Sequence, residues 1–124
     1  MIRRSSYNVI MKVKYRVKTH EDFQEVIKQK QSVSNRIFVL YYKKNNLDHS
    51  RVGISSSKKL GNAVTRNKVR RQIRMMAKEI INFDYSIDYC IIVRKQYLQE
   101  KFENNKKELS ILIEKAIRRI KNEI

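Results

Sequence analysis

The residues best suited to chemistry in this chain are the arginines and lysines between positions 58 and 78. This stretch, KKLGNAVTRNKVRRQIRMMAK, holds eight basic residues and no acidic residue, although the whole chain contains 12 carboxylates. Arg66, Arg70 and Arg74 follow one another at i,i+4 spacing, where like charges on a helix repel. Guanidinium groups bind phosphates through paired hydrogen bonds and stack on bases. The pattern therefore predicts a surface that binds a polyanion.

The basic stretch also has the periodicity of an amphipathic helix. Its apolar side chains recur at the spacing of one helical face: Val69, Ile73, Met76, Ala77 and Ile80. At roughly 100° per residue the basic side chains fall on an adjoining sector, so one side of the helix can be buried while the other presents cations. A charged helix that only faces water normally mixes signs to gain i,i+4 pairs. The absence of acidic residues favours a bound polyanion over a solvated face.

Capping residues indicate where two of the helices begin. Gly61 permits an unusual backbone angle and Asn62 is a typical N-cap, so the basic helix is expected over residues 63–81. Thr19, with an acidic residue three positions later, resembles a capping box. It predicts a first helix that runs to about residue 30.

Strands and a last helix complete a mixed fold. Runs of β-branched and aromatic residues predict strands at 36–43, 51–57 and 88–93, with a short additional strand at 32–34. An amphipathic pattern predicts a last helix from about residue 102 to the end. The order helix, three strands, helix, strand, helix indicates an α+β fold, built as a two-layer α/β sandwich. We expect a single domain over residues 1–124, with a basic and partly mobile arm at 1–18.

The predicted strand at 36–43 (RIFVLYYK) is apolar on both of its sides. Alternation puts Ile37, Val39 and Tyr41 on one side and Phe38, Leu40 and Tyr42 on the other. Such a strand is either central in its sheet or uses one side as a binding surface. Phe38 and Tyr42 are interpreted as core, whereas Tyr41 suits the core and a base-stacking surface about equally.

Composition and charge narrow the classes of function. The net charge of +17 favours a nucleic acid as partner. Apolar residues make up 41% of the chain, which is enough for a real core. An anionic membrane is the weaker interpretation, because no apolar run approaches the ~20 residues that span a bilayer. The one cysteine, Cys90, excludes an intrachain disulfide and is interpreted as a small buried hydrophobe. We expect the protein to be cytoplasmic.

Catalytic and metal-binding patterns are missing from the sequence. His20 and His49 are isolated, and both are interpreted as structural or solvent-exposed. The chain shows no glycine-rich phosphate loop, no cluster of metal ligands and no nucleophile beside a base. We therefore expect no catalytic residue and no metal site in the protein itself.

Several segments together resemble the bacterial ribonuclease P protein subunit. The most specific is GNAVTRNKVRRQIR at 61–74, which is similar to the signature of that family. EDFQEV at 21–26, NRIFVLYY at 35–42 and RVGISSSKKLGNAV at 51–64 resemble it in order and spacing. The resemblance covers roughly residues 15–94, and the last helix agrees only in type.

The resemblance implies a small basic protein bound to a large catalytic RNA that removes the 5′ leader from precursor transfer RNA. In such a ribonucleoprotein the RNA and its magnesium ions hydrolyse the phosphodiester, so Mg²⁺ is expected to be held mainly by the RNA subunit. The expected partners are the ribonuclease P RNA and the single-stranded leader of precursor tRNA, with one protein monomer on each RNA. The family fold is similar to a ribosomal-protein domain and contains a rare left-handed βαβ crossover.

The resemblance also implies roles for particular residues. Those expected to face the catalytic RNA are Arg66, Asn67, Lys68, Arg70, Arg71, Arg74, Lys58 and Lys59. Those expected to line a leader-binding cleft between the first helix and the sheet are Phe23, Ile27, Val39 and Tyr41.

Three positions depart from the family pattern. Ile27 replaces a frequent aromatic residue, Ser56 replaces an apolar strand residue, and Arg70 stands where lysine is frequent. Apolar contact remains available at Ile27, although stacking does not. Two rival classes share the charge of this chain: a ribosomal or general RNA-binding protein, and a nuclease that cleaves without an RNA subunit.

Overall fold

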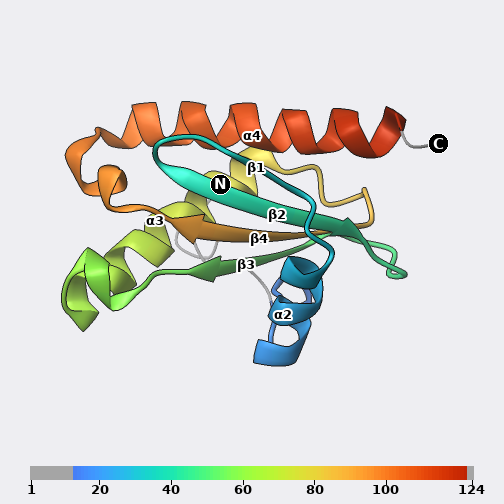
Figure 1. The fold of residues 1–124 in the computed structure, drawn as a ribbon, viewed down its shortest axis with the longest axis horizontal. Helices are drawn as coiled ribbons and strands as arrows, with labels where there is room; N and C mark the ends of the chain where they lie inside the picture. Colours follow the sequence, from blue (N-terminus) through green and yellow to red (C-terminus); the bar gives the residue numbers. More distant parts are fainter. Residues whose placement is uncertain (1–12, 123–124) are drawn as a thin grey trace, which may run out of the picture.

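The computed structural model describes residues 13–122, and its elements follow the predicted order (Figure 1). These elements are η1 Val13–Tyr15, α2 His20–Lys28, β1 Ser32–Ser34, β2 Phe38–Lys44, β3 Arg51–Ser55, η2 Lys58–Leu60, α3 Ala63–Ile80, β4 Ile87–Val93, η3 Lys95–Gln99 and α4 Phe102–Asn122. The α+β class and the order of helices and strands are confirmed. The three short helices η1, η2 and η3 are additions that the sequence pattern does not predict.

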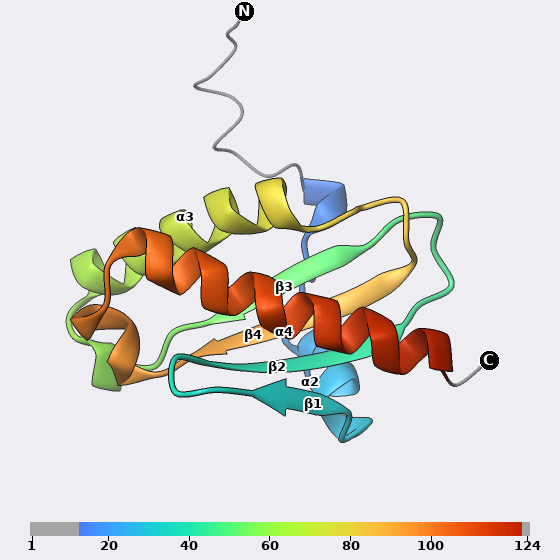
Figure 2. The same cartoon turned by 90° about the horizontal axis from the view of Figure 1, so that it is seen from above.

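The four strands form one mixed sheet in the order β1-β2-β4-β3. β2 is antiparallel to both of its neighbours, whereas β3 and β4 are parallel. The chain passes from β3 through α3 to β4, and Figures 1 and 2 together show that this crossover is left-handed. β2 is thus a central strand, as one of the two interpretations of its apolar sides requires.

The helices lie on both faces of the sheet. α3 and α4 pack on one face and enclose the main core, while α2 crosses the opposite face (Figure 2). Four residues of the predicted stripe on α3 are buried there: Val69, Ile73, Met76 and Ala77. α2 fully buries only Val26, so much of its sheet face stays open to solvent.

Both predicted helix caps are present. The Thr19 side chain accepts a hydrogen bond from the Asp22 N–H over 3.0 Å, and Asn62 does the same for the Thr65 N–H over 3.0 Å. Gly61 has a φ of 133°, which suits a residue without Cβ and ends η2 directly before α3. These contacts fix where α2 and α3 begin.

Asn35 shapes the turn into β2 and delays the start of the strand. Its Oδ1 accepts hydrogen bonds from the N–H groups of Ile37 and Phe38, both over 2.9 Å. Ile37 therefore lies in the turn and belongs to the buried core with an exposed fraction of 2%, so its predicted placement beside Val39 is wrong. The rest of the alternation is confirmed: Phe38, Leu40 and Tyr42 are buried, and Val39 and Tyr41 are half-buried.

Part of the predicted basic arm is attached to the sheet. The Tyr15 ring lies 4.8 Å from that of Phe83, measured between centroids. The Val17 N–H donates to the Val52 carbonyl oxygen over 3.0 Å. Residues 1–12 lie outside the described residues, so mobility of that part of the arm stays a prediction. Over residues 13–122, no helix combines the length and apolar content of a membrane span.

Gly53 on β3 allows α2 to approach the sheet closely. A Cβ at this position would lie 2.9 Å from Phe23 Cδ2 and 3.0 Å from Val17 Cβ. Both distances are shorter than ordinary carbon contacts, so any side chain here would push Phe23 away from the sheet.

We therefore expect Gly53→Ala to destabilise the protein by about 1–3 kcal/mol, the usual cost of overpacking. Urea unfolding followed by circular dichroism measures this. Ser55→Ala on the same strand is the control and should change the free energy of unfolding by less than about 0.5 kcal/mol. Equal stability of the two variants would show that the packing of Phe23 against the sheet does not require glycine at position 53.

Candidate nucleic-acid interface

α3 carries most of the residues that were predicted to face an RNA, and η2 carries the rest. We call this set the basic ridge: Lys58, Lys59, Arg66, Asn67, Lys68, Arg70, Arg71 and Arg74. Arg66, Arg70 and Arg74 are partly buried, and the other five are exposed. Because the apolar stripe of α3 is fixed in the core, these side chains project from a rigid helix.

The positive charge of the basic ridge is not neutralised by the described part of the protein. Within residues 13–122, none of its side chains forms an ion pair with a carboxylate. The carboxylates that do form ion pairs in this part of the chain have partners elsewhere: Lys28, Arg36, His49, Arg51 and Lys106. The ridge therefore keeps its full charge for an external anion.

Neutral groups orient Arg70, which stands near the middle of α3. One guanidinium nitrogen donates to Ser56 Oγ over 2.5 Å, and another donates to Asn67 Oδ1. Ser56 is the residue that departs from the apolar family pattern, and here its hydroxyl positions an arginine. Arg66 differs, because its Nε is buried without a hydrogen-bond partner in the described residues.

Arg16 joins the ridge from outside α3. Burial lowers the pKa of the Arg74 guanidinium, and the nearby charges of Arg16 and Arg70 lower it further. Arg16 forms an isolated bridge with Val52 on β3, which holds this part of the chain in place. The sequence pattern predicts Arg16 within a mobile arm and gives no signal for this role, because the contact with β3 brings Arg16 to the ridge.

The four predicted cleft residues lie on the α2 side of the sheet, and all four are half-buried. The strand register puts Ser32, Tyr41, Cys90 and Gly53 in one row across the sheet, and Ser34, Val39, Ile92 and Ser55 in the next. Phe23 covers the first row at Gly53. We call the surface formed by Phe23, Ile27, Val39 and Tyr41 the cleft. Ile92 and Ser55, which continue its floor, were not predicted.

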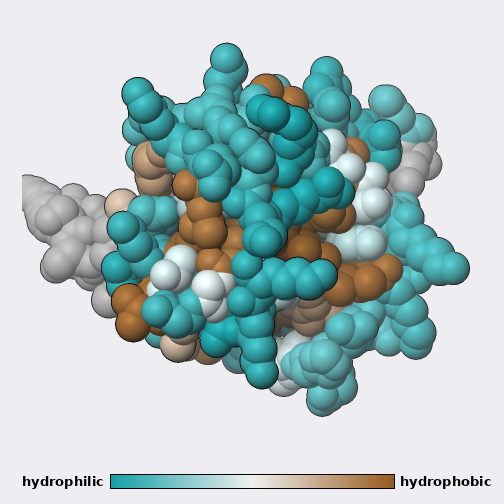
Figure 3. Space-filling model, turned by 60° about the vertical axis from the view of Figure 1, so that its left-hand side comes forward, coloured by the Kyte–Doolittle hydropathy of each residue, from teal (hydrophilic) through white to brown (hydrophobic). Residues whose placement is uncertain are grey.

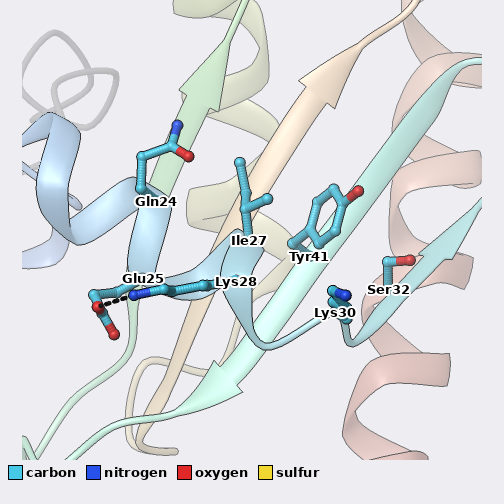
Figure 4. Close-up of a pocket in the computed structure, with 7 residues that line it drawn as sticks. All are labelled: Gln24, Glu25, Ile27, Lys28, Lys30, Ser32 and Tyr41. Carbon is cyan, nitrogen blue, oxygen red and sulfur yellow. Dashed lines mark ion pairs between the residues drawn. The ribbon is translucent and has the colours of Figure 1, made fainter.

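Two cavities open at the two ends of α2. One has a volume of about 550 Å³ and is lined by Ile27 and Tyr41, which stand side by side in Figure 4. The other has about 430 Å³ and is lined by Phe23, Ser56 and Arg70. Arg70 thus belongs to the ridge and also lines the cavity beside Phe23 of the cleft. Figure 3 shows apolar surface framed by hydrophilic residues on one face of the molecule.

An arginine beneath α2 ties this helix to the sheet. Arg51 donates from Nη2 to Asp88 Oδ2 over 2.7 Å and from Nε to Asp88 Oδ1 over 3.0 Å. Its Nη1 lies 3.5 Å from Asp22 Oδ2 on α2. The hydrogen bond to Asp88 raises the pKa of Arg51. We call these contacts the Arg51 clamp, and they remove this arginine from the set available to RNA.

Cys90 and the histidines have structural surroundings. Burial raises the pKa of the Cys90 thiol to about 12, and its side chain is fully buried, which confirms the interpretation as a small hydrophobe. His49 contacts Asp48 Oδ1 and the Lys14 carbonyl oxygen, both at 2.8 Å. His20 is exposed beside the cavity at Phe23. In the described chain, no three His, Cys, Asp or Glu residues gather into a group that could hold a metal ion.

Comparisons with known proteins agree with this geometry. The family model described as Ribonuclease P matches residues 11–117. A protein of Mesoplasma florum named "Ribonuclease P protein component" is 47% identical over 105 residues, which cover 83% of this chain and 96% of that protein.

Solved structures show the same relationship. The Staphylococcus aureus RNase P protein superimposes with a TM-score of 0.74 at 40% identity, covering 82% of this chain and 94% of that one. The Thermotoga maritima RNase P protein gives a TM-score of 0.67 at 31% identity, covering 78% and 94%. The family model spans most of the chain and the relatives match along nearly their whole length, so this chain belongs to the ribonuclease P protein family.

Proposed function

We propose that this chain docks on the catalytic RNA of ribonuclease P through the basic ridge and holds the 5′ leader of precursor tRNA in the cleft. The observation that carries this proposal is the position of Arg70. Its side chain stands in a row of arginines that have no carboxylate partner within residues 13–122, and it also lines the cavity beside Phe23. One side chain thereby joins a surface for a folded RNA to a groove for a single strand.

Docking on the RNA rests on charge. Each phosphate that the ridge neutralises releases bound counterions, so affinity falls with salt by a log–log slope on the order of −0.7 to −0.9 per phosphate. Phosphate also stabilises the charge of Arg74, whose pKa is lowered by burial and by the nearby charges of Arg16 and Arg70. Arginine suits this task because its planar group makes two parallel hydrogen bonds to one phosphate.

Leader binding rests on apolar contact and stacking. Tyr41 and Phe23 offer half-exposed rings at separate cavities, and Ile27 adds an aliphatic contact beside Tyr41. Rings that stack on unpaired bases contribute about 1–3 kcal/mol each in single-strand binders. The same surface has no partner in mature tRNA, which lacks the leader, so the cleft favours the precursor.

We assign hydrolysis to the RNA subunit and place Mg²⁺ mainly on its phosphates. The described residues offer no cluster of three potential metal ligands, and the two histidines have the structural or exposed positions given above. The protein contributes binding and orientation, and its positive charge reduces repulsion between the RNA and its substrate. These tasks place the protein in the cytoplasm with its RNA partner, one monomer on each RNA.

The proposal is tested by reconstitution with ribonuclease P RNA at low magnesium concentration. The wild-type protein should restore cleavage of precursor tRNA, and Arg70→Ala with Arg74→Ala should lower its affinity for the RNA by at least about tenfold, with a shallower salt slope. The fold of the double variant should persist, because both side chains reach the surface and their loss removes repulsion. Filter binding at several salt concentrations and circular dichroism measure these effects.

The matched control is Lys107→Ala with Arg118→Ala on α4, which removes two exposed charges away from the ridge. It should retain RNA affinity to within about twofold. Equal losses of RNA affinity in the two double variants would show that the ridge contributes only nonspecific charge. Cleavage by protein whose copurifying RNA was digested before the precursor tRNA was added would instead identify a protein-only nuclease.

Tyr41→Ala should weaken binding of leader-bearing precursor by about fivefold or more while leaving mature tRNA binding unchanged, because only the precursor supplies a strand to the cleft. Affinities for both ligands are measured with the reconstituted ribonucleoprotein. Tyr85→Ala, which alters a tyrosine with 37% exposure outside the cleft, is the control. Equal losses for precursor and mature tRNA would contradict a leader-binding role.

A further inference from the structure

A separate cavity lies between the first half of α3, η3 and the start of α4. Its volume is about 440 Å³, and residues that line it include Val64, Lys68, Tyr97, Leu98 and Asn105. No residue of this cavity lines either cavity of the cleft. Its size falls within the range of small-ligand sites.

One residue that lines the cavity has a buried acceptor without a partner in the described residues. Asn105 is only 1% exposed, and its Nδ2 donates to the Tyr97 carbonyl oxygen over 3.2 Å, which fixes the orientation of the amide. Its Oδ1 has no hydrogen-bond partner among the described residues. Buried acceptors of this kind are rare because leaving them unpaired is unfavourable. A ligand that brings a hydrogen-bond donor satisfies this atom.

The rim of the cavity is apolar and exposed. Val64 on α3 is 76% exposed and Leu98 on η3 is 45% exposed, although both side chains are large hydrophobes. Together they border one opening, where a flat apolar ring would cover both. Lys68 borders the same opening and belongs to the basic ridge, so the cavity continues the proposed RNA surface.

We propose that this cavity receives one unpaired, amino-bearing base of the catalytic RNA, an inference that rests on the proposed function. The ring of the base lies against Val64 and Leu98, and its exocyclic amine donates to Asn105 Oδ1. Lys68 pairs with the adjoining phosphate. Uracil fits less well, because its only ring donor is flanked by two carbonyl oxygens. Lys68 connects the cavity to the positive charge of the ridge, and the Glu100 carboxylate that also lines it is paired with Arg36 over 3.8 Å, so RNA is favoured over a protein side chain as the occupant.

The test uses the full-length protein with Val64→Ser and Leu98→Ser together, and ribonuclease P RNA of the same organism. Both positions are exposed and uncharged, so the melting temperature and the salt slope of RNA binding should stay unchanged. Affinity should fall by at least about fivefold, the effect of losing one base contact. Leu98→Ser alone is the second variant, and it should lower RNA affinity less than the double variant does.

The control pair is Leu47→Ser with Ile111→Ser, which changes side chains with 40% and 38% exposure that do not line the cavity. Its affinity should match the wild type. Dimethyl sulfate, which methylates unpaired adenine at N1 and cytosine at N3, then locates the base, and kethoxal does the same for guanine. Wild-type protein should protect one unpaired base that the Val64→Ser, Leu98→Ser variant leaves reactive.

Unchanged affinity in the rim variant would overturn the cavity proposal, and so would a loss of affinity without a base that changes protection. In both cases Arg70→Ala with Arg74→Ala still decides the proposed function on its own, since those residues lie outside this cavity. If the ridge variant also retains RNA affinity, the proposed function fails together with the base site.

Discussion

This structure depends on one constraint: it must hold close together arginines whose charge no carboxylate of the described residues neutralises. Burial lowers the pKa of the Arg74 guanidinium, and the nearby charges of Arg16 and Arg70 lower it further. A protein can keep such a cluster only if other contacts fix its frame. Here the apolar stripe of α3 supplies that frame, since Val69 and Ile73 are enclosed between the helix layer and the sheet.

The left-handed crossover gives this frame its functional geometry. It carries the chain from β3 to β4 through α3, so the basic ridge runs beside the sheet edge at which β3 lies. Arg70 then reaches Ser56, just beyond β3, and enters the cavity beside Phe23. A surface suited to a folded RNA and a groove suited to a single strand therefore meet at one arginine, although they belong to opposite sides of the sheet.

Patterns that depend on local chemistry could be predicted from the sequence. The caps at Thr19 and Asn62 are confirmed because each involves residues only three positions apart. The buried side of β2 is also confirmed, except at Ile37, where the Asn35 side chain replaces strand pairing with a turn. The four cleft residues lie on the α2 side of the sheet, and their role in leader binding stays a prediction of the family resemblance.

Features that depend on distant contacts could not be predicted. Arg16 reaches the ridge only through its bridge to Val52, and Arg51 is taken from the RNA surface by Asp88, 37 positions later in the chain. The left-handedness of the crossover was implied by the family resemblance. Periodicity could not predict it, because the apolar stripe of α3 has the same spacing whether the connection is left-handed or right-handed. The orphan acceptor of Asn105 likewise has no sequence signal, since it arises where η3 turns into α4.

The Arg51 clamp makes the position of α2 respond to ions. This helix fully buries only Val26, and it is also attached through the contact of Arg51 with Asp22, whose side chain is 44% exposed. Dissolved salt screens such a contact, with a Debye length of about 10 Å at 0.1 M. Rising ionic strength thus weakens the contact between Arg51 and Asp22 while it also weakens attraction to phosphate. Under the proposed function, the ionic composition of the surroundings would therefore tune the binding of a single strand and the docking on a folded RNA in the same direction.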